Sequence, residues 1–500
     1  MVDKTSANNE PSLTRQATSG AMWSLASNIT VSALSFLGTA VLARLLNPHD
    51  FGLIGMATLV IGVVQLFGNF GLGSAIVQKM DVTHEDLCTV HWANIAAGIV
   101  LMLLCIIISP LAAHFFREQS VQGVLICLAF TFIISAISSV HNTLIYKNLQ
   151  MKPLAVIEVS GRVLRIGVML VAAYHGLNFW SIVIGMIVER IFKTIGFHYL
   201  IEWRPSWFFS WNKFKEMFRF GRNLLGGGLA GYANQNMDFI VTGRAMGADQ
   251  LGYYQMAFNL PNLIRSYLCD SFGNVVFPVF SKIQDDNELL AKGFSKIVKY
   301  ITLTTFPILF GLAFTTHDFI LVVYGEKWLP VVVPMQILCF SAALATSYVP
   351  VGGLLNAKGR PDLAFKWGVF KLPVTVIAIL LGVYFGGIIG VAWGMFAVDI
   401  LNLILIYEVY KILKADMSEY VMAIFPAIVA SLLMVAVLWG LRFMLLMFDV
   451  FPLARLSFMI IIGATVYATA IFLGFRDIFN EFVMFSQKIF FGERSERRSS

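Results

Sequence analysis

Long uncharged segments dominate this chain of 500 residues. Apolar runs of roughly 18 to 26 residues alternate with short clusters of charge, and a hydrocarbon core about 30 Å thick takes about 20 helical residues to cross. Only 13% of the residues are charged and 58% are hydrophobic, whereas soluble domains carry about 25% charged residues. The pattern predicts an all-α polytopic membrane protein and excludes soluble enzymes, secreted scaffolds and nucleic-acid binders, despite the net charge of +7.

The apolar runs predict fourteen membrane spans. The first run is too long for the apolar region of a signal peptide and ends in Asn47-Pro48-His49-Asp50 rather than at a small-residue cleavage site, so we expect it to be retained. The predicted spans lie at 20–46, 51–77, 88–109, 122–142, 154–175, 179–200, 220–244, 251–280, 298–316, 331–356, 363–385, 388–413, 419–441 and 453–474. The ninth span is expected to end irregularly, through His317, Asp318 and the stretch Tyr324–Pro330.

The distribution of lysine and arginine predicts that both termini are cytoplasmic. With the N-terminus inside, about 25 of the 36 basic residues fall in the tails or the cytoplasmic loops, and about 6 in the opposite loops. All segments outside the spans are short, which leaves no room for a soluble catalytic domain. The five cysteines show no paired spacing, so neither a disulfide framework nor a metal site is expected.

The sequence contains a weak internal repeat. A shift of 200 residues places Gly52 on Gly252, and a shift of 209 places Gly185 on Gly394. Because each repeat holds an even number of spans, the copies would be related by an axis along the membrane normal, with the transport path between them. The predicted organisation is a cytoplasmic N-terminal tail at 1–19, an N-lobe at 20–200, an interfacial amphipathic linker at 201–219, a C-lobe at 220–413, two extra spans at 414–475 and a basic cytoplasmic tail at 476–500.

The linker between the lobes mixes aromatic and basic side chains. Trp203, Trp207 and Trp211 lie close in sequence to Lys213 and Lys215. Aromatic rings partition to the membrane interface and basic groups meet anionic headgroups, so we expect this segment to lie on the inner leaflet. An entry gate for a lipid substrate is the alternative.

Ionisable side chains inside the spans are the main candidates for a binding site, because such groups usually face a bundle interior or a wet cavity. In the fifth span, spacings of four and three residues place Glu158, Arg162 and Arg165 on one helical face. The shift of 209 places Arg162 on Lys371, and Arg265 lies near the middle of the eighth span. We therefore predict that Arg162, Arg165, Arg265 and Lys371 line a cavity that accepts an anionic cargo, since arginine binds phosphate through a two-pronged fork.

The same charges have a purely structural interpretation, in which they neutralise one another. Glu158 would then pair with Arg162 along one helix, and Arg265 would pair with Asp238. We leave both interpretations open at this stage.

Further polar residues in the spans suggest roles in binding sugars and coupling ions. Amide side chains suit sugar hydroxyls, and the candidates are Gln65, Asn234, Gln235 and Asn236. A carboxylate can couple transport to H⁺ or Na⁺, and the candidates are Glu158, Asp238 and Asp399. The chain contains no GxxxxGK[ST] loop, so direct ATP drive and a bound cofactor are not expected.

Several segments match a known family in the expected order along the chain. They are Leu42–Gly52, Asn236–Val241, Leu251–Tyr254, Phe277–Gln284 and Tyr324–Trp328. Through them the chain resembles the bacterial polysaccharide flippases of the multidrug/oligosaccharidyl-lipid/polysaccharide (MOP) superfamily, in particular the Wzx-type, colanic-acid-exporter (WzxC-like) branch. The family has no fixed motif for its cavity cations, so the residues proposed above remain inferences from position.

The resemblance implies a MATE-like fold of about fourteen helices, with two six-helix lobes forming a V and two C-terminal helices, and alternating access. It also implies a flippase rather than an enzyme. The implied cargo is an undecaprenyl-diphosphate-linked oligosaccharide, moved from the inner to the outer leaflet of the bacterial inner membrane for exopolysaccharide, capsule or lipopolysaccharide export. Expected partners are this substrate, the bilayer and a polysaccharide polymerase or export machinery, with no nucleic acid.

Two other functions remain as alternatives. A MATE-type drug/cation antiporter would prefer an acidic cavity, whereas several intramembrane groups here are basic. A membrane polysaccharide polymerase or ligase would need a sizeable outer loop with catalytic groups, and the predicted outer loops are short.

Overall fold

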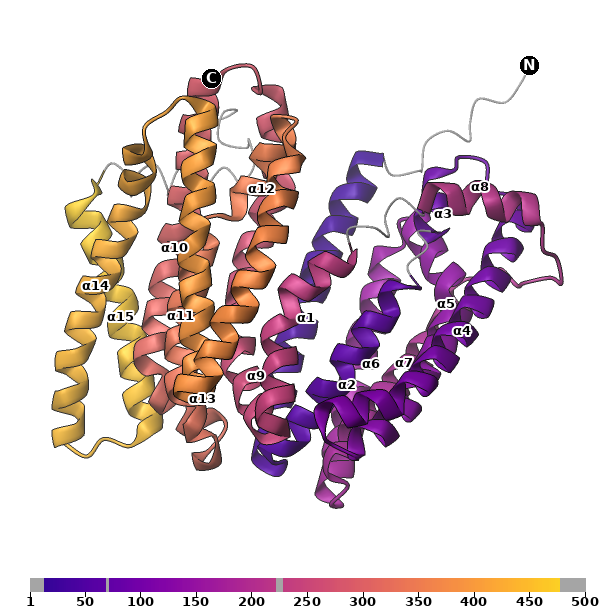
Figure 1. Ribbon diagram of the computed structural model, residues 1–500, viewed down its shortest axis with the longest axis horizontal. Helices are drawn as coiled ribbons and strands as arrows, with labels where there is room; N and C mark the ends of the chain where they lie inside the picture. Colours follow the sequence, from indigo (N-terminus) through magenta and orange to yellow (C-terminus); the bar gives the residue numbers. More distant parts are fainter. Residues whose placement is uncertain (1–12, 69–71, 222–227, 477–500) are drawn as a thin grey trace, which may run out of the picture. The chain divides into compact units, whose positions relative to one another are not determined.

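The computed structural model describes residues 13–68, 72–221 and 228–476, and every regular element within these ranges is helical (Figure 1). The elements are α1 (Leu13–Leu45), α2 (Pro48–Leu66), α3 (Leu72–Gln78), α4 (His84–Phe116), α5 (Ser120–Lys147), α6 (Met151–Tyr174), α7 (Asn178–Leu200), α8 (Trp211–Gly221), α9 (Gly228–Lys282), α10 (Asn287–Val323), the 3₁₀ helix η2 (Glu326–Val331), α11 (Val332–Thr346), α12 (Val349–Ala357), α13 (Pro361–Leu413), α14 (Met417–Met447) and α15 (Pro452–Gly474).

Two of the helices are long because each contains two limbs. The helical backbone of α9 is interrupted at Gly247, which has a φ of 81°, and that of α13 at Gly386 and Gly387. The positive φ of Gly247 is a conformation that glycine adopts without a steric penalty. With these limbs counted separately, and with η2, α11 and α12 taken as one irregular span, the described helices account for the predicted set of about fourteen crossings.

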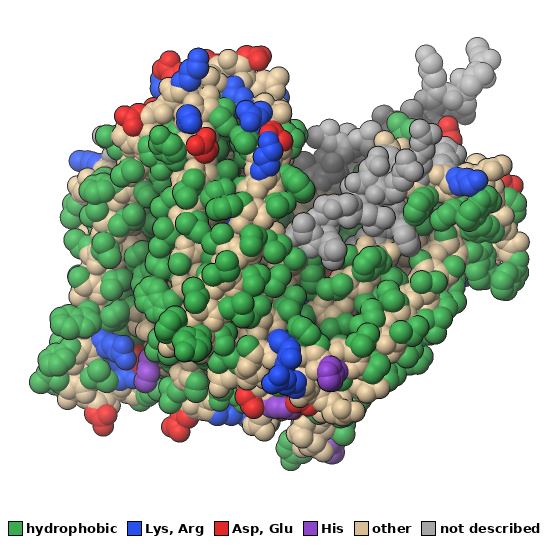
Figure 2. Space-filling view, in the orientation of Figure 1, with side chains coloured by type: hydrophobic (Ala, Val, Ile, Leu, Met, Phe, Trp, Pro, Cys, Tyr) green, Lys and Arg blue, Asp and Glu red, His purple; other side chains and the backbone are tan. Residues whose placement is uncertain are grey.

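Nine helical segments of the described chain, one of which runs through η2, α11 and α12, are long and apolar enough to cross a membrane by length and composition alone. Of the longer helices, α6, α7 and α9 fall short of these criteria. They are the helices that carry the intramembrane charges near Arg162 and Arg265. Over the helices of the C-terminal half, Figure 2 shows hydrophobic side chains along the helices and charged side chains gathered at their two ends, as expected of membrane spans.

Two predicted span boundaries are wrong. The second span was predicted to reach residue 77, but α2 ends at Leu66 and the short helix α3 begins at Leu72. The ninth span was predicted to end at residue 316 with an irregular exit, but α10 continues through His317 and Asp318 to Val323. The predicted irregular stretch at Tyr324–Pro330 is confirmed, since the 3₁₀ helix η2 lies there. The helix tolerates Asp318 because this buried carboxylate accepts a hydrogen bond from Arg455 of α15.

Capping residues explain where several helices begin. In α2, the side chain of Asp50 accepts a hydrogen bond from the backbone N–H of Asn47 at 2.9 Å, and Pro48 occupies the first turn. In α4, Thr83 and Asp86 form the same reciprocal capping box. Such boxes satisfy the backbone N–H groups that a helix start leaves unpaired.

The chain divides into two compact units, residues 1–252 and residues 253–500. The core of unit 1 packs α2, α4, α5 and α7 together and includes Met56 and Leu125, both fully buried. One core of unit 2 joins α10, α12, α13 and α14 and includes Phe294 and Tyr410. The division falls at Gly252, within α9, and reflects how the residues pack. The lobes at 20–200 and 220–413 were inferred from the sequence repeat instead, and they stay a prediction.

Candidate functional site

The first candidate site lies between α6 and α7 in unit 1. The two helices form an antiparallel hairpin that turns at residues 175–177. Gly161 packs against the side chain of Lys193, and Gly196 packs against Ile157, so small residues bring the helices close at the level of the charged face. Because the helices approach closely, the face of α6 that was predicted from the sequence to be charged lies against α7.

Glu189 of α7 lies at the centre of these charges and is only 6% exposed. Its carboxylate oxygens lie 3.6 Å from Nη2 of Arg162, 3.1 Å from Nη1 of Arg165 and 2.9 Å from Nζ of Lys193. Lys193 also donates to Oε2 of Glu158 at 2.5 Å. Glu158 is therefore paired with Lys193 rather than with Arg162, and Arg162 is paired with Glu189.

The α6–α7 charge cluster carries more positive than negative charge. It contains the three cations that contact Glu189, and Arg190 lies near enough to interact electrostatically with Arg165. Among the described residues, Glu158 and Glu189 are the carboxylates paired with this cluster of four basic groups, so its formal charge is +2. A part-buried cluster with excess positive charge can hold an anion, because each guanidinium keeps further N–H donors besides those on Glu189.

A second group of charges lies in unit 2 around Asp399 of α13. Lys371, on the first limb of the same helix, approaches Oδ1 of Asp399 to 3.8 Å. The hydroxyl of Ser341 on α11 donates to Oδ2, and the amide of Asn402 donates to Oδ1 at 3.2 Å. Lys371 also lies 5.9 Å from the ring centre of Tyr348. Asp399 is thus buried but well supplied with donors, as a buried charge requires.

Arg265 of α9 belongs to the same neighbourhood. Its Nε and Nη2 donate to Oδ1 of Asn262, one helical turn earlier, at 3.1 and 2.8 Å. Arg265 also interacts electrostatically with Asp399 and Tyr348. The cations Arg265 and Lys371, predicted separately from the sequence, therefore gather around one carboxylate in unit 2.

The structure places the remaining predicted residues on α2 and the first limb of α9. Gln65 is exposed near the end of α2, Asn236 donates to the backbone oxygen of Tyr232 at 2.9 Å, and Asp238 is buried. Asn234 is partly buried and Gln235 is exposed. Among the four amides, Asn236 is engaged with the backbone of its own helix, which limits its use in binding a sugar.

Sequence reasoning missed Glu189 and Lys193, the two residues of α7 that organise the α6–α7 charge cluster. The signal was present, because both lie in the sixth predicted span at a spacing of four residues and so share a helical face. Arg162 and Arg165 lie in the span before it, and a short turn makes the two helices antiparallel neighbours.

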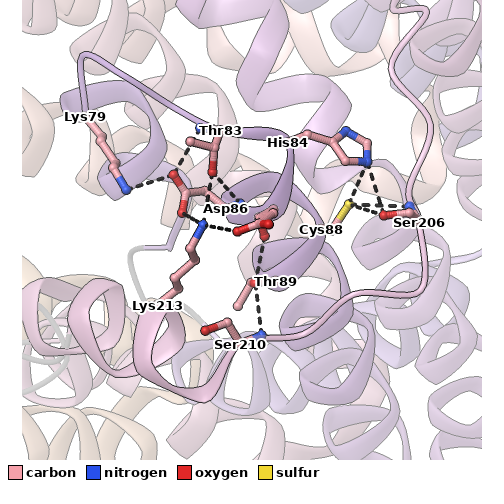
Figure 3. Close-up of polar contacts among 10 residues, drawn as sticks. Lys79, Thr83, His84, Asp86, Cys88, Thr89, Ser206, Ser210 and Lys213 are labelled. Atoms are coloured by element: carbon pink, nitrogen blue, oxygen red, sulfur yellow. Dashed lines mark hydrogen bonds and ion pairs between the residues drawn. The ribbon is translucent and has the colours of Figure 1, made fainter.

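The linker packs against the start of α4 (Figure 3). Lys213 of α8 lies 2.7 Å from Glu85 and 3.2 Å from Asp86, and Lys79 donates to Asp86 at 2.8 Å. The Glu85 carboxylate raises the pKa of Lys213 above its ordinary value. These ion pairs attach the basic face of α8 to the capped end of α4.

Residues 201–210, here called the strap, run from α7 to α8 and are held by neutral contacts. Nε1 of Trp92 donates to the carbonyl of Ser206 at 2.8 Å, and Nε1 of Trp203 donates to His84 at 3.1 Å. Figure 3 shows Ser206 next to His84 and Cys88 of α4. Trp207 is 91% exposed and stacks on Trp92, an arrangement that suits the membrane interface predicted for this segment.

Comparison with solved structures defines the fold class. The structure matches the lipid II flippase MurJ in an inward closed conformation with a TM-score of 0.72 and 14% identity, over 92% of this chain and 99% of that one. It matches an inward-facing MATE-family multidrug resistance transporter of the MOP superfamily with a TM-score of 0.56 and 16% identity, over 79% and 95% of the two chains. The all-α MOP-type fold predicted from the sequence is confirmed.

Sequence comparison then shows the family. Residues 41–333 match the family model described as polysaccharide biosynthesis protein. The chain is 30% identical over 425 residues to the lipopolysaccharide biosynthesis protein WzxC of Escherichia coli strain K12, which covers 84% of this chain and 86% of that protein. The chain belongs to this polysaccharide biosynthesis family of multi-pass membrane proteins, and the resemblance stated from its sequence is confirmed.

Proposed function

We propose that this protein is a flippase that moves undecaprenyl-diphosphate-linked oligosaccharide repeat units from the inner to the outer leaflet of the bacterial inner membrane. The family membership supports a role in polysaccharide biosynthesis, and the relative WzxC is named for lipopolysaccharide biosynthesis. The fold is that of MurJ, which is named as a flippase of lipid II. The observation that carries the proposal is the α6–α7 charge cluster, with its excess of cations on two helices that the sequence predicts to be spans.

The α6–α7 charge cluster suits the diphosphate of such a cargo. Arg162 and Arg165 hold the Glu189 carboxylate, and a phosphate oxygen is the same kind of charge-assisted acceptor with more negative charge. A diphosphate entering from the lipid would share the guanidinium forks with Glu189 or replace it. The excess charge of the cluster offsets the cost of bringing the anion out of water.

Arg265 and Lys371 of unit 2 take part in binding the same headgroup at another stage of the cycle. Both already contact or approach acceptors, Asn262 and Asp399 respectively. Sugars would bind to polar helix faces, for which Gln65, Asn234 and Gln235 stay candidates. The polyprenyl tail would remain in the lipid while the two lobes expose the headgroup alternately to either side.

Asp399 is the best placed of the carboxylates proposed for coupling to H⁺ or Na⁺. Asp399 is buried, and its oxygens contact the Ser341 hydroxyl, the Asn402 amide and the Lys371 ammonium. Protonation of Asp399, or its binding of Na⁺, would therefore weaken its pairing with Lys371, which is proposed to bind the substrate. Glu158 is paired with Lys193 in the α6–α7 charge cluster, and Asp238 is buried on α9.

The chain is a multi-pass membrane protein, and we place both termini in the cytoplasm. It acts with the enzymes that assemble and polymerise the repeat unit. The relatives bear the names of biosynthesis and flippase proteins, which supports a transporter over a polymerase or ligase. The excess of basic groups near Glu189 argues against a MATE-type antiporter of cationic drugs.

The test is a leaflet assay with the purified protein in liposomes that contain a radiolabelled lipid-linked oligosaccharide. A flippase makes the sugar accessible on the opposite leaflet without changing its chemistry. An Arg162→Gln/Arg165→Gln double variant should lose this activity while still being recovered folded from the membrane, with a lowered melting temperature because Glu189 loses two partners. A Lys366→Gln control, whose side chain is 73% exposed, should keep both its activity and its melting temperature. Transfer of the labelled sugar to an acceptor would instead identify an enzyme.

A further inference from the structure

A separate pocket of about 360 Å³ lies in unit 1 at the end of α7, among α5, α7 and the strap. Its lining residues are Ile137, Thr194, Ile195, His198, Tyr199 and Arg204. Its residues differ from those of the α6–α7 charge cluster, and the proposed transport of a lipid-linked sugar does not use it. Its volume is in the range of small-molecule sites.

The polar groups of this pocket suit a phosphate. Nη1 of Arg204 donates to the backbone oxygens of Ile201 and Trp203 at 2.8 and 2.9 Å, which leaves the Nε and Nη2 donors of the fork for a ligand. Nδ1 of His198 donates to the carbonyl of Thr194 at 2.9 Å, and Nε2 can donate to a phosphate when the imidazole carries a second proton. A guanidinium, an imidazole and the phenol of Tyr199 therefore line one small space.

The strap holds these groups in place before any ligand arrives. The carbonyl of Trp203 accepts hydrogen bonds from Nε2 of His141 at 3.1 Å and from Arg204 at 2.9 Å. The ring of His198 stacks on that of His141, with 3.8 Å between their centres. Since His141 is fully buried and belongs to α5, both the cationic and the imidazole sides of the pocket are anchored to the helical core.

An apolar surface continues from the pocket along α7. Ile184, Ile191 and Ile195 are 37%, 42% and 54% exposed, and their spacings of seven and four residues place them on one face of the helix. Tyr199, one turn beyond Ile195, is 89% exposed. A charged pocket at the end of a span, next to an apolar stripe along that span, has the polarity of a phospholipid.

We propose that this pocket binds the headgroup phosphate of an anionic phospholipid, with the acyl chains of that lipid lying along the exposed isoleucines of α7. The charge of Arg204 complements the phosphate, and the strap connects this lipid site to α8. The phospholipid would thereby stabilise the attachment of the strap at the membrane surface.

The proposal is tested by titrating the purified full-length protein with phosphatidylglycerol and, separately, with phosphatidylcholine, and counting bound lipids by native mass spectrometry. The wild-type protein should bind its first phosphatidylglycerol more tightly than its first phosphatidylcholine. Arg204→Gln should weaken the first phosphatidylglycerol about fivefold, the factor expected for one basic residue at an anionic surface. Arg204→Lys, which keeps the charge but not the fork, should fall between the two.

Lys215→Gln is the matched control, because Lys215 is an exposed basic residue on α8 that does not line the pocket. Because Lys215 also faces the anionic surface, this variant should weaken the first phosphatidylglycerol, but by much less than Arg204→Gln does. Equal weakening by Lys215→Gln and Arg204→Gln would show diffuse surface attraction and overturn the proposal, as would a wild type that does not distinguish the two lipids. If Arg204→Gln lowers the melting temperature, a second variant, Tyr199→Leu, tests the site at an exposed position. Its affinity for phosphatidylglycerol should fall, and an unchanged affinity would contradict the proposal. Inorganic phosphate should not displace the lipid, because it lacks the chains.

Discussion

Gly52 and Gly252 make reciprocal contacts within unit 1. A Cβ atom on Gly52 would overlap the carbonyl oxygen of Ala248, and a Cβ atom on Gly252 would overlap the carbonyl oxygen of Pro48. A shift of 200 residues converts each contact into the other, since Pro48 corresponds to Ala248. The two close approaches are therefore equivalent under that shift, and they join the start of α2 to the part of α9 that follows the break at Gly247.

The first prediction concerns this close approach. Gly52→Ala and Gly252→Ala should each lower the melting temperature in detergent, with a loss of about 1–3 kcal/mol in the free energy of unfolding, because backbone rather than a flexible side chain occupies the space. Gly167→Ala is the control, since its added Cβ meets nothing within 4 Å. Equal melting temperatures for all three variants would contradict the close packing.

The second prediction concerns the cations of α6. Arg165→Gln should reduce flipping at least about tenfold, because a hydrogen bond to a charged group contributes about 1.5–3 kcal/mol. Arg165→Lys should recover part of the loss, since it keeps the charge without the fork. The rate of leaflet exchange in liposomes measures both. A rate in Arg165→Gln equal to that of the wild type would remove Arg165 from the binding site.

The third prediction concerns Glu189, which neutralises part of the α6–α7 charge cluster. Glu189→Gln leaves Arg162, Arg165 and Lys193 without their shared carboxylate, so it should cost about 3–5 kcal/mol of stability. An added isoprenyl diphosphate should raise the melting temperature of this variant more than that of the wild type, because the anion replaces the missing carboxylate.

Glu158→Gln is the comparison for Glu189→Gln. The side chain of Glu158 is 34% exposed, and it pairs with Lys193 alone among the cations of the α6–α7 charge cluster, so the same ligand should stabilise this variant less. Identical stabilisation of both variants and the wild type would mean that the diphosphate does not bind at Glu189.

The sequence carried enough information to predict the helices and one charged face, but not how the faces pair. The number of spans follows from hydropathy, which is a local property, and Glu158, Arg162 and Arg165 share a face because of their spacing. Which face of α7 meets them depends on packing at Gly161 and other small residues, so the pairing with Glu189 appears only in the folded helices. Likewise, the helical continuation of α10 through Asp318 depends on a partner more than a hundred residues away.

The fourth prediction concerns the cations of unit 2. Arg265→Ala and Lys371→Ala should each abolish surface polysaccharide export without loss of the protein from the membrane, because both lie near the buried Asp399. Lys366→Ala, on the same limb of α13 as Lys371 but 73% exposed, should export normally. Staining of surface polysaccharide in a deletion strain that carries each variant provides the measurement. Normal polysaccharide in both variants would remove these cations from the proposed site.

The last prediction concerns the buried ion pair that joins α15 to α10. Nε of Arg455 donates to Oδ1 of Asp318 at 3.0 Å, and the two residues are 8% and 1% exposed. After Arg455→Met, His317 at 3.7 Å is the one basic residue left in an ion pair with the buried Asp318 among the residues that the structure describes. The variant should therefore cost about 3–5 kcal/mol of stability. The double variant Asp318→Asn/Arg455→Met should recover most of this loss, because it removes the charge that the single variant leaves unpaired. Thermal unfolding of both proteins in detergent tests the pair, and a double variant no more stable than Arg455→Met would show that Arg455 acts through its packing rather than its charge.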